Sequence, residues 1–230
     1  MRSKFCFVAG VPGSSWSMIS HRLKLVLGHD ISDVTDNRSQ KLSKLNERTG
    51  EPWKDPLNTP YSHFGSYFGP HNEFGEHFDD IPNNYTLESF YDECRLPFAN
   101  ATNSHTKCIR SHWFSYNLDW LWENCKGNSI FLIYKPTDLA IKWWFTRGGW
   151  SISHPVYIWY KDDETIKQQI NEENNNLLKF AEEKNLKWEV YHEGWWLEKF
   201  GREEKQYPNR PPEQEYDKNN ISVIYTKIPK

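Results

Sequence analysis

The sequence has little of what marks several classes of protein. Its four cysteines, at positions 6, 94, 108 and 125, form no Cys-x-x-Cys pair. We therefore expect free thiols in a reducing, cytoplasmic compartment rather than a disulfide framework. No apolar run approaches the roughly 20 residues of a membrane span, and the apolar stretch at 5–9 is too short for a signal peptide. The formal net charge of -3 argues against a general nucleic-acid-binding surface.

A Walker A phosphate loop is also missing. The chain has a glycine-rich turn, Gly10–Gly13, but no lysine follows its last glycine and the G-x-x-x-x-G-K-[ST] spacing is absent. This absence argues against an ATP or GTP hydrolase and against a nucleotide kinase.

Aromatic residues are abundant. They make up 16% of the 230 residues and include 12 tryptophans. Rings therefore supply much of the apolar volume, and they also line ligand clefts well. The length fits a single domain over 1–230.

Apolar periodicity alternates between strand and helix along most of the chain. The predicted strands are Lys4–Ala9, Cys108–Arg110, Ser129–Tyr134, Trp188–His192 and Ile221–Lys227, and the main predicted helices cover 18–27, 118–125, 137–144, 163–184 and 195–200. Thr137 is expected to cap its helix. Gly28 is expected to end the first helix. This alternation predicts an α/β fold, with a three-layer parallel sheet and helices on both faces.

An irregular, aromatic-rich insertion interrupts the pattern at about 30–106. Short helices are expected at Ser39–Arg48 and Leu87–Cys94, and the segment Tyr61–His77 is rich in rings, Asn and His. A lid or acceptor pocket and a packed insertion both stay open for it, and its His and carboxylate residues are also of the types that bind zinc or iron. The spacing of its histidines fits no short ligand motif, so we predict no metal.

The turn after the first strand has the geometry of an anion site. Free N–H groups and the helix dipole at the start of the following helix favour a phosphate or sulfate. Ser14 and Ser15 add hydroxyl donors. An ordinary tight turn between strand and helix is the alternative.

Two later strand ends carry residues suited to the same edge of the sheet. Arg110-Ser111-His112 follows the second predicted strand, and ligands bind at the carboxyl edge of open α/β sheets. Imidazole can take a proton from a hydroxyl at neutral pH, although a structural hydrogen bond is the simpler role for His112. Lys135 lies in the turn after the third strand, and Lys142 lies in the helix that follows. Both could reach a second phosphate, and a solvated helix face is the alternative for Lys142.

Together these pieces resemble sulfotransferases that use 3'-phosphoadenosine-5'-phosphosulfate (PAPS). The family loop reads roughly Tyr-Pro-Lys-Ser-Gly-Thr-Thr-Trp, and Val11–Trp16 is similar to its end. A later Lys-Thr-His matches Arg110–His112. A third family segment, Tyr-Val-Ala-Arg-Asn-Pro-Lys-Asp-Val-Ala-Val-Ser-Tyr-Tyr, is followed closely by Phe131–Trp144. The matched parts cover under a third of the chain.

The resemblance implies a P-loop NTPase-like sulfotransferase fold and transfer of a sulfonyl group from PAPS to a carbohydrate or small alcohol. It implies His112 as the catalytic base. It also implies that PAPS, as cosubstrate, contacts Pro12, Gly13, Ser14, Ser15, Trp16, Arg110, Lys135 and Lys142.

The sequence departs from the family at three positions. Val11 stands where the family has its loop lysine. Tyr134 and Lys142 stand where the family has the arginine and the serine that hold the 3'-phosphate. A non-catalytic PAPS- or nucleotide-binding module on the same fold is therefore the alternative function.

Overall fold

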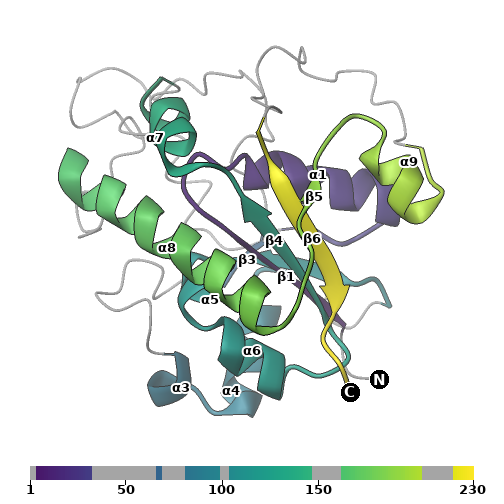
Figure 1. Cartoon of the computed structure of the whole chain (residues 1–230). Helices are drawn as coiled ribbons and strands as arrows, with labels where there is room; N and C mark the ends of the chain where they lie inside the picture. The colour runs from purple at the N-terminus through teal and green to yellow at the C-terminus, as the bar shows by residue number, and fades with distance from the viewer. Residues whose placement is uncertain (1–3, 33–65, 69–80, 99–103, 147–161, 204–219) are drawn as a thin grey trace, which may run out of the picture.

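The computed structural model describes residues 4–32, 66–68, 81–98, 104–146, 162–203 and 220–230 (Figure 1). The elements in chain order are β1 (Phe5–Gly10), α1 (Trp16–Leu27), β2 (Ser66–Tyr67), α3 (Ile81–Asn84), α4 (Leu87–Arg95), β3 (Lys107–Arg110), α5 (His112–Tyr116), α6 (Leu118–Asn124), β4 (Ser129–Tyr134), α7 (Thr137–Thr146), α8 (Asp163–Glu183), β5 (Glu189–Val190), α9 (Trp195–Phe200) and β6 (Ser222–Lys227). These elements make a mixed α/β fold around one open sheet.

The described strands form a six-stranded sheet in the order β2-β3-β1-β4-β6-β5. β1 lies between β3 and β4 and is parallel to both, and β2 is parallel to β3. The carboxyl ends of β1, β3 and β4 therefore meet at one edge, where ligands bind in open α/β sheets.

The expectation of a wholly parallel sheet is wrong at β6. This strand pairs antiparallel with β4 and with β5, so the sheet is mostly rather than entirely parallel. The strand's apolar pattern marks which side chains face the core, but it carries no information on the direction in which the strand runs.

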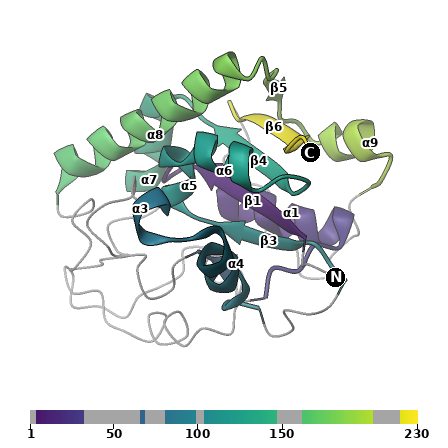
Figure 2. The same cartoon turned by 90° about the horizontal axis from the view of Figure 1, so that it is seen from below.

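Helices cover both faces of the sheet, as predicted. Phe5, Phe7 and Ala9 of β1 pack on the face covered by α4, α5, α6 and α8, whereas Cys6 and Val8 pack on the face covered by α1 and α9. Figure 2 shows the sheet between these two layers. Because both faces are covered, every residue of β1 is buried.

Parts of the predicted insertion belong to the core. Phe68, Ile81, Phe90 and Cys94 are all fully buried against the same face as α8. Their rings and side chains extend the apolar layer under β3 and β1. The predicted helix at 39–48 and most of the segment 61–77 lie outside the described residues.

Most predicted boundaries hold to within one or two residues. α1 ends where predicted, at Gly28, whose φ of 70° is the left-handed conformation that glycine adopts most readily. α7 begins at Thr137 itself, and the Ala140 N–H donates to the Pro136 carbonyl. Thr137 is therefore the first residue of the helix rather than its cap, and the Pro136 carbonyl accepts the first hydrogen bond of the helix.

Candidate functional site

The turn between β1 and α1 packs closely against neighbouring backbone. Gly13 has φ 81°, and a Cβ placed on it would lie 2.2 Å from the carbonyl oxygen of Ala140 in α7. The Ser14 N–H donates to the Val11 carbonyl at 3.0 Å, which closes the turn. Glycine is therefore required at position 13 for both the backbone conformation and the space.

Two hydroxyl groups of this turn are buried without a hydrogen-bond partner among the described residues. They are the Oγ atoms of Ser14 and Ser15, and Ser14 is fully buried. Ser15 has φ 64° and precedes α1 without a side-chain capping bond, and the first turn of α1 holds no acidic residue. Buried polar groups in native proteins normally have partners. These hydroxyls, beside the positive end of a 12-residue helix, match the needs of a bound oxyanion.

The end of β3 brings a cation and an imidazole to this turn. Arg110 is fully buried, and its Cζ lies 5.5 Å from the centre of the Trp16 ring. The His112 ring lies on the same tryptophan, with 4.5 Å between ring centres. Ser111 caps α5 by accepting a hydrogen bond from the Trp113 N–H at 3.1 Å, which fixes how the chain leaves the strand.

His112 is held by a carboxylate from α8. Its Nδ1 lies 3.0 Å from Oε2 of Glu173, and both side chains are buried. The other oxygen of Glu173 accepts a hydrogen bond from the Gln169 amide at 2.6 Å, and Ser115 Oγ donates to Oε2 at 3.4 Å. The pair resembles the base and orienting group of nucleophilic and general-base sites.

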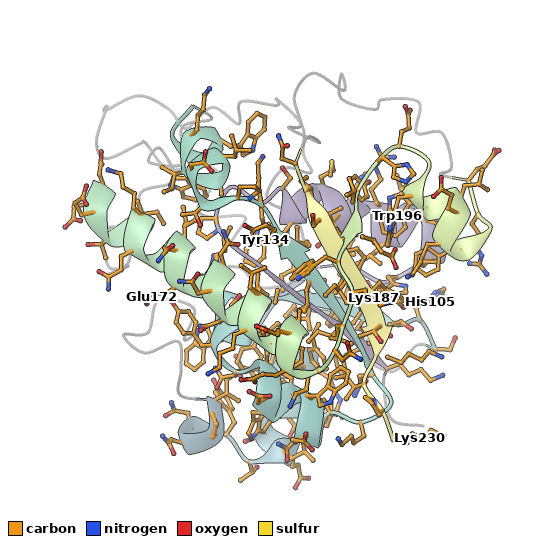
Figure 3. The ribbon with its side chains drawn as sticks, in the orientation of Figure 1. His105, Tyr134, Glu172, Lys187, Trp196 and Lys230 are labelled. Carbon is orange, nitrogen blue, oxygen red and sulfur yellow. The ribbon has the colours of Figure 1, made fainter. Side chains whose placement is uncertain are left out.

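The end of β4 carries a second buried cation. Lys135 is fully buried, with its Nζ 5.1 Å from the centre of the Trp143 ring. Its carbonyl accepts a hydrogen bond at 2.8 Å from Asn174, which also donates to Thr137 Oγ1 at 3.1 Å. Figure 3 shows Tyr134 at this end of β4. Two adjacent residues of α8 thus hold two strand ends. Glu173 binds His112 after β3, and Asn174 binds the backbone after β4.

The structure brings most of the predicted residues to one edge of the sheet. Arg110 and His112 both lie against the Trp16 ring, the turn Pro12–Ser15 lies at the end of the central strand, and Lys135 follows the adjacent strand. Lys142 lies in the second turn of α7 with its side chain exposed to solvent.

Sequence reasoning missed Glu173 and Asn174. The α8 prediction rested on Ile166, Ile170 and Leu177, which are buried as expected. Glu173 and Asn174 lie on this same helical face, three and four residues after Ile170, and are buried too. The sequence signal that could have revealed them is the presence of a carboxylate and an amide on the otherwise apolar face of this helix.

Thiol chemistry is not supported by the cysteines. All four are buried and free, and burial raises the pKa of each. For Cys108 and Cys125 the pKa rises to about 12. None is therefore a thiolate at neutral pH, which is the form that attacks or binds metal.

Among the residues that the structure describes, no three His, Cys, Asp or Glu side chains gather in a way that could hold a metal ion. Within the same ranges, no helix has both the length and the apolar character needed to cross a membrane.

Comparison of the chain with protein-family models, curated proteins and solved structures finds no match.

Proposed function

We propose that the protein is a PAPS-dependent sulfotransferase that moves a sulfonyl group to a hydroxyl of a carbohydrate or small alcohol. One observation carries the proposal. The buried hydroxyls of Ser14 and Ser15, which have no hydrogen-bond partner in the described part of the chain, lie at the start of α1. The same sheet edge also holds buried Arg110 and the His112–Glu173 pair. An anion site and a base at one edge are what transfer of a charged group requires.

The proposed residues divide the work of the reaction. The turn Gly13–Trp16 binds the 5'-phosphosulfate through its hydroxyls and the first N–H groups of α1. The Ser14 N–H already bonds to the Val11 carbonyl, so the remaining N–H groups and the two hydroxyls make the contact. Buried Arg110 and Lys135 supply positive charge, and Lys142 extends toward the 3'-phosphate. His112 takes the proton of the acceptor.

The lysine of the family loop has no direct substitute at its own position. Val11 is fully buried in the apolar core that contains Phe7 and Ala9. In the proposed enzyme, Arg110 and Lys135 at the adjacent strand ends supply the positive charge that the lysine supplies in the family. If these cations bind the anion without supporting transfer, the protein is a PAPS- or nucleotide-binding module, which the tests below separate from an enzyme.

Binding is tested by titration calorimetry with adenosine 3',5'-bisphosphate, the product of the proposed transfer. A hydrogen bond to a charged group contributes about 1.5–3 kcal/mol, so Ser14→Ala or Ser15→Ala raises Kd about 10- to 100-fold. Ser20→Ala is the matched control, because its buried hydroxyl already donates to the Trp16 carbonyl at 2.9 Å. Failure of the bisphosphate to bind, or equal losses in all three variants, rejects the anion site.

Turnover is tested with labelled PAPS and a panel of sugars and alcohols. A positioned general base contributes a factor of about 10²–10⁴, so His112→Ala lowers kcat by that order. The Kd for the bisphosphate stays within about threefold, since His112 acts on the acceptor proton. Binding of the bisphosphate without transfer to any acceptor supports the binding module instead. An unchanged kcat in His112→Ala rejects the assignment of His112 as the base.

A further inference from the structure

Glu173 is an unusual residue for its place in the fold. It lies in the middle of α8 on the face that packs against the sheet, and its side chain has no exposed surface. Burial of an ionised carboxylate is unfavourable by several kcal/mol unless donors surround it. A purely structural position on this face would be filled more stably by a leucine or isoleucine, as at Ile170 and Leu177.

The donors around Glu173 are specific. His112 Nδ1 and Ser115 Oγ face Oε2 at 3.0 and 3.4 Å, and the Gln169 amide faces Oε1 at 2.6 Å. An ionised carboxylate only accepts hydrogen bonds, so the nitrogen of His112 that faces it must carry a proton. In a neutral imidazole the other nitrogen, Nε2, is then the one with a lone pair.

We infer that Glu173 is a positioning residue, which holds His112 as the Nδ1-protonated tautomer and so makes Nε2 the atom that accepts the proton of the substrate. The catalytic part of this inference rests on the proposed sulfotransferase function, whereas the tautomer follows from the contacts of an ionised Glu173 carboxylate with His112 Nδ1, Ser115 and Gln169.

The acceptor O–H bond breaks and its proton goes to Nε2 of His112, while the acceptor oxygen forms a bond to the sulfur of PAPS. The bond between that sulfur and the oxygen of the 5'-phosphate breaks, and adenosine 3',5'-bisphosphate leaves. The imidazolium then lies against the Glu173 carboxylate, which stabilises its charge.

Glu173→Gln is the sharpest perturbation because it keeps the shape of the side chain. The Gln169 amide donates to Oε1, so the new carbonyl stays against Gln169 and the new amide faces His112. An amide N–H facing Nδ1 requires that nitrogen to accept, which moves the proton of His112 to Nε2. We expect kcat to fall about 10²- to 10⁴-fold with little change in Kd for the bisphosphate.

Glu172→Gln is the matched control. Glu172 is the preceding residue of α8 (labelled in Figure 3), and its carboxylate accepts from Gln168 at 2.8 Å and from Tyr116 at 3.5 Å. The control removes the same charge from the same helix without touching the imidazole. Glu173→Asp keeps a carboxylate, and we expect it to recover the Nδ1-protonated tautomer and part of kcat.

The tautomer is read directly from the ¹⁵N chemical shifts of the histidine ring, assigned by comparison with a His112→Gln spectrum. The wild-type protein should show Nδ1–H, as should Glu172→Gln, and Glu173→Gln should show Nε2–H. A wild-type His112 protonated at Nε2 overturns the inference even if no Glu173 variant folds. An unchanged tautomer in Glu173→Gln overturns it as well.

The two proposals fail in distinguishable ways. If no acceptor is sulfated but the tautomer switches in Glu173→Gln, the proposed function is wrong and Glu173 still positions His112. If sulfation occurs and the tautomer switches while kcat stays within about threefold of wild type, the positioning role is wrong and the function stands. Loss of kcat equal to that of Glu172→Gln also contradicts the role, because it reflects only the removed charge.

Discussion

Replacing Gly13 by alanine tests how closely the turn after β1 packs against α7. Two costs combine at this position. The residue has φ 81°, and an added Cβ would lie 2.2 Å from the Ala140 carbonyl oxygen and 3.0 Å from the carbonyl carbon. Both neighbours are backbone atoms, so neither can rotate away, and either the turn or α7 must shift.

The size of the effect follows from the two costs. A left-handed conformation costs an alanine about 1–2 kcal/mol. Overpacking that forces a backbone shift costs about 1–3 kcal/mol. We therefore expect Gly13→Ala to lower the free energy of unfolding by about 2–5 kcal/mol. For a chain of this length that corresponds to a fall in Tm of about 4–20 °C.

Gly127→Ala separates the two costs. Gly127 has φ 79°, nearly the same as Gly13, but a Cβ there would meet nothing within 4 Å. This control has only the conformational cost, so its Tm falls by about 2–8 °C. The assay is thermal unfolding of wild type and both variants by circular dichroism, with urea titrations to compare free energies. Equal losses in the two variants would refute the close approach of the turn to α7.

Three further predictions follow from single residues. Burial lowers the pKa of His29 from 6.5 to about 4. Between these pH values the unfolded chain binds a proton that the folded chain excludes, so the free energy of unfolding decreases by up to about 3 kcal/mol as the pH falls through this window. Urea titrations should show a flatter pH dependence for His29→Gln, and equal slopes contradict the assignment. Lys142→Ala should raise Kd for adenosine 3',5'-bisphosphate about two- to fivefold, because exposed ion pairs contribute at most about 1 kcal/mol. The Kd for adenosine 5'-phosphate should not change, and equal losses for both ligands place Lys142 on a solvated face. Asn128→Ala leaves the buried N–H of Phe5 without its acceptor at 2.9 Å, which lowers the free energy of unfolding by about 1–3 kcal/mol. Asn124→Ala, on the exposed surface of α6, is the control for chemical denaturation.

Elements with strong apolar patterns were predicted well from the sequence. Ser129–Tyr134 was expected as a buried strand and is β4 with the same bounds, because a strand covered on both faces needs a nearly continuous apolar run. The direction of β6 was not predictable in the same way. Its partners β4 and β5 are set by tertiary packing, which the strand's own residues do not encode.

Most of the candidate site was also predictable. The turn Gly13–Ser15, Arg110 and His112 follow strands directly, and parallel strands bring their carboxyl ends to one edge, so local sequence was enough to place them. Glu173 comes from a distant helix, and because most glutamates are exposed, its place in the sequence did not single it out. Its burial depends on meeting His112, which only the tertiary structure determines.

Because α8 follows the strand ends by many residues in the chain, the site is completed late in synthesis. His112 meets its carboxylate 61 residues later in the chain, and the carbonyl after β4 meets Asn174 39 residues later. At the ribosome, the glycine-rich turn and all three strand ends emerge before either contact is possible. A nascent chain therefore holds the components of an anion site well before its imidazole has a fixed proton. Because Glu173 and Asn174 are adjacent, a single docking event of one helix delivers both contacts together.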